Sequence, residues 1–297
     1  MCKYVCHAFV PAFMLIAFTA STAQEIHLQY RFEPGKTYSY KRVISSNVTS
    51  TLPGQGEISY EQKVETPVTL TGIAAPEDMV GFQYLQDTAF VESSSSLPSA
   101  VDFPSIASLV NHVRIAFIMT PRGIVRSTRL LDSLPSSGKP MMYAAFTDSA
   151  IAAWVMPFRT LPDRALKEGL RWSVNQSDTI SPQAATKNAS FKNSTMITQE
   201  TGEYVVNGFE EFKGMKCVRL SWDITQDTES EMEANNMEMF IEVETRYEGS
   251  MLFAYEKGLM VHMEETQSST QTTSVTGQQE MVVPTSTEQK TTLTFIP

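Results

Sequence analysis

Apolar and polar residues alternate along much of this chain, and the longest such run extends from Met237 to Tyr255. Its odd-numbered positions are mostly apolar, whereas its even-numbered positions include four glutamates and one arginine. A period of two with one apolar face predicts a half-buried antiparallel strand. Because strands usually have about five or six residues, we expect this one to bend, with Gly249 as the bulge position. Shorter runs of the same kind cover residues 26–32, 80–84 and 218–224.

Glycine and proline mark the turns that would join such strands into hairpins. Thr120–Gly123 has proline second and glycine fourth, which suits a type I turn between two short strands. Glu256–Gly258 would join the long strand to the next one. Thr276–Gln278 would begin a last hairpin that ends near Phe295.

One segment departs from the strand pattern. Of the 18 residues from Lys139 to Met156, 13 are apolar, and the many alanines favour a helix. Pro140 fits the first turn of a helix, and Pro157 would end it. A helix that is apolar on nearly all sides must be buried, so we expect it against the concave face of a curved sheet. A second, shorter helix is predicted from Pro104 to about Val110.

The two halves of the chain share landmarks at a nearly constant spacing. Phe32–Ser39 parallels Leu166–Ser173 at an offset of 134 positions, and the hairpin glycines Gly123 and Gly258 are 135 positions apart. We interpret this spacing as an internal duplication, although glycines and aromatic residues also recur at strand starts in unrelated β proteins.

The predicted fold class is mainly β with some helix (α+β). Long curved antiparallel strands would form one extended sheet or two half-barrels, because each half alone would leave its edges unpaired. The predicted domains are a signal peptide at 1–23, a first β-rich repeat at 24–160 that ends in the apolar helix, and a second β-rich repeat at 161–297.

Residues 1–23 have the features of a secretory signal peptide. Lys3 is the only charged residue, and the apolar stretch that follows is too short to span a bilayer. Ser21 and Ala23 are small residues at positions −3 and −1 of a cleavage site before Gln24. A short membrane anchor is the alternative interpretation. We therefore expect an exported protein, in the periplasm, at the outer membrane or outside the cell, with no transmembrane span after cleavage.

Composition and charge narrow the classes of function. The 297 residues are 42% hydrophobic, which excludes a disordered chain, and the formal net charge of −10 argues against nucleic-acid binding. The charge is also uneven, since Asp227–Glu265 holds 11 acidic and two basic residues. A solvated sheet face explains this run, and an acidic back of the sheet that faces a partner or cations is the sharper hypothesis.

No residues gather into a known catalytic or metal-binding motif. His27, His112 and His262 each fall on the polar parity of their strands, without a second histidine or cysteine at ligand spacing. Cys217 has Arg219 on the same strand face but no local histidine, so an inert thiol is predicted. We therefore predict that the protein is not an enzyme and that it has no catalytic residues, no metal and no cofactor.

One set of residues is a candidate binding surface for an apolar ligand. It combines Met239, Met251 and Phe253 on the long strand with Phe146 and Trp154 on the predicted helix. Flexible thioethers beside aromatic rings suit a surface that adapts to its ligand. Ordinary core packing explains the same residues, and soft-metal binding by the methionines is a further alternative.

The motifs around Phe32–Tyr38, Thr120–Gly123, Leu161–Trp172 and Asn207–Cys217 resemble those of an uncharacterised family of secreted bacterial β-rich proteins. This resemblance would cover most of the mature chain, and it implies a bacterial envelope setting. More loosely, long curved strands around an apolar helix are similar to the half-barrels of envelope lipoprotein carriers, which is an analogy of fold only.

Two functions remain in view. The first is a non-catalytic, exported cell-envelope module with an interaction or structural role, whose partner would be another envelope protein. The alternative is a carrier or sensor of an apolar, lipid-like ligand held between the curved sheet and the helix.

Overall fold

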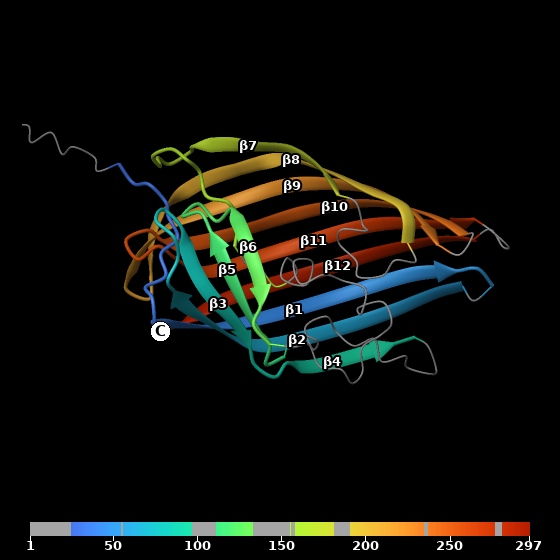
Figure 1. Cartoon of the computed structure of the whole chain (residues 1–297), viewed down its shortest axis with the longest axis horizontal. Helices are drawn as coiled ribbons and strands as arrows, with labels where there is room; N and C mark the ends of the chain where they lie inside the picture. The colour runs from blue at the N-terminus through green and yellow to red at the C-terminus, as the bar shows by residue number, and fades with distance from the viewer. Residues whose placement is uncertain are drawn as a thin grey trace, which may run out of the picture.

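The computed structural model describes residues 25–54, 56–96, 111–132, 155, 158–180, 191–234, 237–276 and 281–297. These residues form one open antiparallel sheet of twelve strands (Figure 1). In chain order the strands are β1 (Thr37–Leu52), β2 (Gly56–Ile73), β3 (Val80–Gln86), β4 (Phe90–Ser95), β5 (Arg114–Met119), β6 (Val125–Leu130), β7 (Arg171–Ile180), β8 (Phe191–Phe212), β9 (Met215–Ala234), β10 (Met237–Ala254), β11 (Leu259–Thr276) and β12 (Met281–Ile296).

The predicted mainly β class is confirmed in its coarse form. Every element of the described residues is a strand, and these strands form one extended sheet rather than two separate half-barrels. The predicted helical part of an α+β fold has no support there. The expected helix at 139–156 lies outside the described residues except for Val155, which is buried, and the expected helix at 104–110 lies wholly outside them.

Most neighbouring strands of the sheet are also neighbours in the sequence, and the first and last strands, β1 and β12, pair with each other. Across the sheet the order is β6-β5-β3-β2-β1-β12-β11-β10-β9-β8-β7, with β4 paired to β2. The first and last long strands lie side by side at the centre, where Tyr40 is opposite Phe295. The β1–β12 pair therefore joins the strands of the first half of the chain, β1–β6, to those of the second half, β7–β12.

Alternation along β10 gives the sheet an inner and an outer face, as predicted. Thr245, Met251 and Phe253 at odd positions are buried, while Glu242 and Glu244 at even positions are exposed. The bulge expected at Gly249 lies instead between Leu252 and Phe253, where the register with β11 shifts. The expectation for Gly249 was wrong because that glycine serves another purpose: an added Cβ would lie 2.5 Å from Cζ2 of Trp222.

The hydrophobic core lies at one end of the long strands. There the short strands β3 and β5 cross in front of the long strands (Figure 1), and aromatic contacts connect the two layers. Phe82 stacks on Phe117 at 5.0 Å, both Phe82 and Tyr30 contact Phe158, and Tyr30 meets Phe253 edge-on at 5.3 Å. The other ends of the long strands carry mostly polar, half-exposed residues.

The segment before β1 closes this core by contacting two hairpin turns. The backbone N–H of Tyr30 donates to the carbonyl of Pro121 at 2.7 Å, and that of Arg31 donates to the carbonyl of Gly258 at 2.9 Å. Both turns occur where the sequence predicted them. A Cβ at Gly123 would lie 2.8 Å from the Tyr30 ring, and one at Gly258 would lie 2.6 Å from Cγ of Arg31. Glycine is therefore needed at both turns for close approach of the chain, in addition to its positive φ.

The two halves of the chain use the same local hydrogen bonds. The N–H of Gly35 donates to the carbonyl of Gly72 at 2.8 Å, and the N–H of Gly169 donates to the carbonyl of Val206, 134 positions further on, at 2.8 Å. The order β6-β5-β3-β2-β1 is also matched by β11-β10-β9-β8-β7. The duplication stays a prediction, and this correspondence supports it.

Candidate functional site

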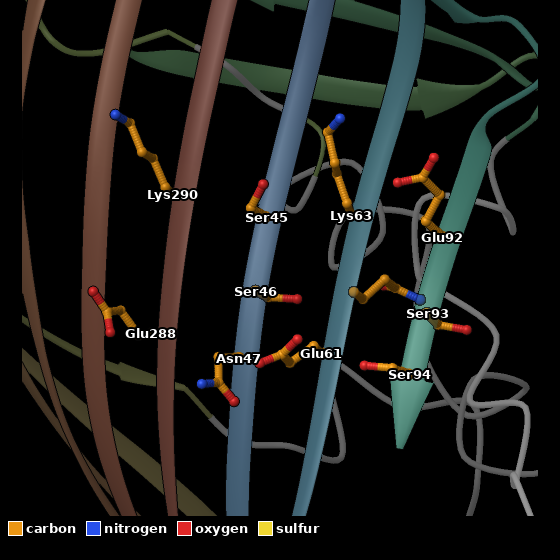
Figure 2. A pocket seen from close by; sticks show the side chains of 11 residues that line it. Ser45, Ser46, Asn47, Glu61, Lys63, Glu92, Ser93, Ser94, Glu288 and Lys290 are labelled. Carbon is orange, nitrogen blue, oxygen red and sulfur yellow. The ribbon is translucent and has the colours of Figure 1, made fainter. Parts of the chain in front are cut away.

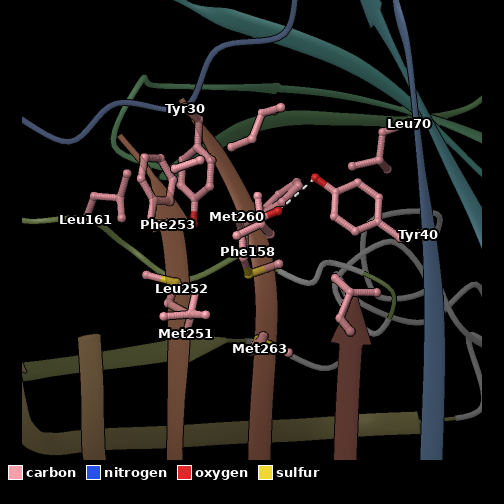
Figure 3. Close-up of a cluster of buried hydrophobic side chains, with 14 of the residues drawn as sticks. Tyr30, Tyr40, Leu70, Phe158, Leu161, Met251, Leu252, Phe253, Met260 and Met263 are labelled. Atoms are coloured by element: carbon pink, nitrogen blue, oxygen red, sulfur yellow. Dashed lines mark hydrogen bonds between the residues drawn. The ribbon is translucent and has the colours of Figure 1, made fainter. Parts of the chain in front are cut away.

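The five residues predicted to bind an apolar ligand do not gather within the described residues. Met251 and Phe253 are 1% and 0% exposed and belong to the packed core shown in Figure 3. Met239 is only partly buried and lies twelve residues earlier on β10. At about 3.4 Å per residue that separation is roughly 40 Å. Phe146 and Trp154 lie outside the described residues, so the combined site stays a prediction.

A charged and aromatic cluster lies beside the core on the inner face. The guanidinium of Arg159 forms an ion pair with Glu265 and lies over the rings of Trp222 and Tyr247, at 5.5 and 5.3 Å from their centroids. Trp222 donates its indole N–H to Glu265 at 3.0 Å, and the hydroxyl of Tyr30 donates to the backbone carbonyl of Arg159 at 2.9 Å.

Within this cluster Arg159 and Glu265 balance each other's charge. Burial alone would lower the pKa of the Arg159 guanidinium, but the Glu265 carboxylate together with Tyr204 and Tyr247 offsets this, and the pKa lies above its ordinary value. Burial also raises the pKa of Tyr204, which packs against Trp222, to about 12. Arg159 and Tyr204 therefore keep their protons at neutral pH, and the cluster connects the segment before β7 to β9, β10 and β11.

A second buried polar cluster lies on β1, β2 and β3. Arg42 is 7% exposed and donates through Nη2 to Oε1 of Gln86 at 2.5 Å. The hydroxyl of Tyr84 donates to the same oxygen at 3.2 Å, and Nε2 of Gln86 donates to Asn111 at 2.8 Å. The Nε of Arg42 and the hydroxyl of Thr66 are buried and have no hydrogen-bond partner in the part of the chain that the structure describes.

His112 lies beside Thr88 and Asp87 at an exposed position. His112 lies 3.0 Å from the Thr88 hydroxyl and 3.6 Å from Asp87, but its side chain and that of Asp87 are 65% and 66% exposed. In such an exposed position water screens the pair, and a nucleophile would not be activated. No group of three or more metal-ligating side chains occurs among the residues that the structure describes. The predictions of no enzyme activity and no metal remain predictions.

Two open pockets in the described part of the chain are lined mainly by polar and charged residues. One of about 510 Å³ lies over β12, β1, β2 and β4, where Lys63 and Lys290 alternate with Glu61, Glu92 and Glu288 (Figure 2). Another of about 460 Å³ lies over β10, β11, β12 and β1 and is lined mainly by serine, threonine and charged residues. These linings suit water and ions better than an apolar chain.

The outer face of β9 and β10 carries a ladder of opposed acidic residues. The register places Asp227 opposite Glu244 and Glu229 opposite Glu242, and it also aligns Asp223 with Glu248 and Glu233 with Glu238. Arg246 forms ion pairs with Asp223 and Glu248 at 2.8 and 2.5 Å. No ion pair reaches Asp227, Glu229, Glu242 or Glu244 from any described residue. We call these four residues the acidic ladder.

Sequence reasoning missed the buried Arg42 and the half-buried Arg159, and for Arg42 a signal was available. Arg42 has the parity of Tyr38 and Tyr40 on β1, which are 4% and 1% exposed. A cation at an apolar position of a strand is unexpected, and this parity could have identified it. Arg159 lies between strands, where no periodic pattern applies.

Comparison with known proteins gives no family. No family model matches the sequence, and no curated protein matches it. Among solved structures, an outer membrane channel from Pseudomonas putida F1 aligns over 90% of this chain and 98% of its own, with 8% identity and a TM-score of 0.28. OmpF of Salmonella typhi in complex with daunomycin aligns over 86% of this chain and 98% of its own, with 6% identity and a TM-score of 0.27. Likenesses this weak carry no argument about this chain.

Within the described residues, no helix has the length and apolar character needed to cross a membrane.

Proposed function

We propose that this chain is a non-catalytic, exported module of the cell envelope whose acidic ladder binds a cationic surface of another envelope protein. Its location would be the periplasm, the outer membrane or the cell exterior. The signal-peptide features of residues 1–23 support export. The interaction role is preferred over catalysis because no acid, base and nucleophile share a buried site in the described residues.

The acidic ladder is the observation that carries this proposal. Like charges directly opposite each other on neighbouring strands destabilise a sheet. The chain nevertheless places two such pairs side by side without a cation of its own among the described residues. A basic partner would neutralise the ladder, and the resulting field would also speed its association.

Site-specific photo-crosslinking in the native host tests this role. A photoreactive residue at Glu229 or Glu244 should give a discrete adduct with a basic protein, and the adduct should weaken as salt rises. The same residue at the exposed control positions Glu77 and Glu168 should give none. The proposal fails if the ladder gives no adduct, or if replacing Asp227, Glu229, Glu242 and Glu244 with their amides leaves the adduct from a neighbouring position unchanged.

Intact-mass measurement of the exported protein tests its location independently. Cleavage before Gln24 without added acyl chains is the expected result. A mass that retains residues 1–23 would contradict the assignment of a signal peptide and favour the membrane anchor.

The second candidate function is a carrier or sensor of an apolar ligand. One observation favours it, namely that the odd positions of β10 line the inner face of the curved sheet, as the ligand hypothesis requires. A fluorescent fatty-acid probe separates the two functions. Uptake by wild-type protein that is lost in Met239→Asp, with the fold retained, would support the carrier, whereas no uptake by wild-type protein would contradict it.

A further inference from the structure

Arg42 is a buried cation for which the described residues supply no counter-charge. It lies on the inner face of β1, between Tyr40 and Ile44, and is directly opposite Leu293 on β12 and Thr66 on β2. No carboxylate of the described residues forms an ion pair with it. An isolated charge in a protein interior is expensive unless a partner neutralises it.

Two hydrogen-bonding groups next to each other are open at this point. The Nε of Arg42 and the hydroxyl of Thr66 are both buried, and neither has a hydrogen-bond partner among the described residues. Directly opposite residues on neighbouring antiparallel strands have Cβ atoms about 4.5–5.5 Å apart. The two open groups therefore belong to one place on the inner face, where a single acceptor group can meet both.

The surrounding hydrogen bonds fix the guanidinium but do not neutralise it. Gln86 is a neutral amide that accepts from Arg42 at 2.5 Å and from Tyr84 at 3.2 Å. Burial raises the pKa of Tyr84, so its hydroxyl stays protonated and acts as a donor. The backbone N–H of His112 donates to the carbonyl of Gln86 at 2.8 Å, which ties the segment that carries Asn111 to β3. The network orients Arg42 and leaves its positive charge intact.

We propose that Arg42 and Thr66 bind the carboxylate group of an apolar organic acid. A carboxylate oxygen would accept from Nε of Arg42 and from the Thr66 hydroxyl, and its single negative charge would balance the single positive charge. A phosphate group carries about −1.5 to −2 at neutral pH and would leave an unbalanced charge there. The residues beside the pair, Ile44, Val64 and Leu293, are apolar and favour an apolar body behind the carboxylate. This site is on the opposite face of the sheet from the acidic ladder and does not depend on it.

Thermal unfolding of the full mature protein in the presence of defined probes tests the site. Sodium octanoate should raise the unfolding temperature in a saturable way, whereas 1-octanol at equal concentration should not. Comparison with acetate shows whether the ligand is an apolar organic acid or a small free carboxylate. Octanoate should bind about fourfold more tightly for each methylene that it buries, and equal affinities would assign the site to small free carboxylates. Stabilisation by inorganic phosphate beyond that by the carboxylates would overturn the carboxylate assignment.

Three variants connect the effect to the proposed residues. Arg42→Met should abolish the octanoate shift while leaving the ligand-free unfolding temperature unchanged or higher, because an unbalanced charge has been removed. Thr66→Val should weaken octanoate binding about tenfold, and it decides the question if Arg42→Met fails to fold. Lys41→Met, on the outer face of the same strand, should behave as wild type. The proposal is wrong if octanoate does not stabilise the wild type, or if it stabilises Arg42→Met and Thr66→Val equally well.

Discussion

Arg159 and Glu265 form an ion pair on the inner face of the sheet although 106 positions separate them in the sequence. Their side chains are 25% and 14% exposed. The pair fastens the segment before β7 to β11, and the rings of Trp222 and Tyr247 cover the guanidinium. It is therefore a long-range connection between the two halves of the chain.

Replacing Glu265 with glutamine should destabilise the protein by about 2–3 kcal/mol, somewhat below the usual loss for a fully buried pair because both groups keep some contact with water. The glutamine still accepts from Trp222, so the loss reports mainly on the charge of Arg159 left unpaired. Urea unfolding of wild type and variant measures it. As a control, Asp223→Asn breaks an exposed pair with Arg246 and should change stability by less than about 1 kcal/mol. Equal losses in the two variants would show that burial of the Arg159 pair is unimportant.

Gly35 and Gly169 should respond alike to substitution. Their φ angles are +80° and +76°, and a Cβ added at either would meet no atom within 4 Å. Alanine should therefore cause only backbone strain, about 1–2 kcal/mol at each position, and the two losses should add because the sites are far apart. Denaturant midpoints of the single and double variants check this. Unequal losses would argue that the two turns are not equivalent parts of a repeated unit.

The sequence predicted the strands well wherever one face of the sheet is buried. Along β10 the period of two was decisive, because a strand with one solvent-exposed face must alternate apolar and polar residues. The hairpin glycines Gly123 and Gly258 were also recognisable, since turns restrict residue type locally. The order of strands across the sheet could not be predicted, because the pairing of β1 with β12 joins residues more than 200 positions apart and leaves no periodic mark.

The candidate sites were less accessible to sequence reasoning. Met239 and Met251 share a strand face, and this parity made them look like one site. Parity fixes the side of the sheet but not the distance along the strand, so the two residues lie in different environments. The Arg159 cluster depends on contacts between four separate segments, which no local pattern records.

Cys217 should be unreactive in the native protein at pH 8. Burial raises the pKa of its thiol to about 11, so little thiolate forms at that pH. The native state holds this proton to a higher pH than the unfolded chain, whose thiol has a pKa of about 8.5. This residue's contribution to stability should therefore fall as pH rises from about 8.5 towards 11. The rate of labelling with a thiol reagent, with and without urea, measures the reactivity of Cys217. Rapid labelling of folded protein at pH 8 would contradict the buried position.

Asp132 should contribute to stability only above strongly acidic pH. Hydrogen bonds from the Arg114 guanidinium and backbone N–H lower the pKa of this carboxyl to about 2. A lowered pKa stabilises the folded state above the unfolded value of about 3.9, and this stability is lost as pH falls through about 2. Asp132→Asn should thus be less stable than wild type at pH 6, and the two stabilities should converge near pH 2. A constant difference across that range would show that the ion pair contributes nothing.

Gly249→Ala tests whether the inner face requires a gap at the Trp222 ring. The added Cβ would lie 2.5 Å from Cζ2 of Trp222 and 2.7 Å from the carbonyl of Glu264. One contact is with a rigid ring and the other with the backbone of β11, so neither can yield without moving a packed element. Overpacking of this kind destabilises by about 1–3 kcal/mol.

The same shift of the indole should weaken its hydrogen bond to Glu265, which is 3.0 Å long in the intact cluster. Near-ultraviolet circular dichroism would report the ring, and urea unfolding the stability. Ser250→Ala, one position along the strand, should be nearly neutral. Trp222→Leu should lose stability by itself and should reduce the further loss from Gly249→Ala, because the ring contact is gone while the 2.7 Å contact with the carbonyl of Glu264 remains. Independent losses in that double variant would show that Gly249 is required for some other reason than the space its neighbour occupies.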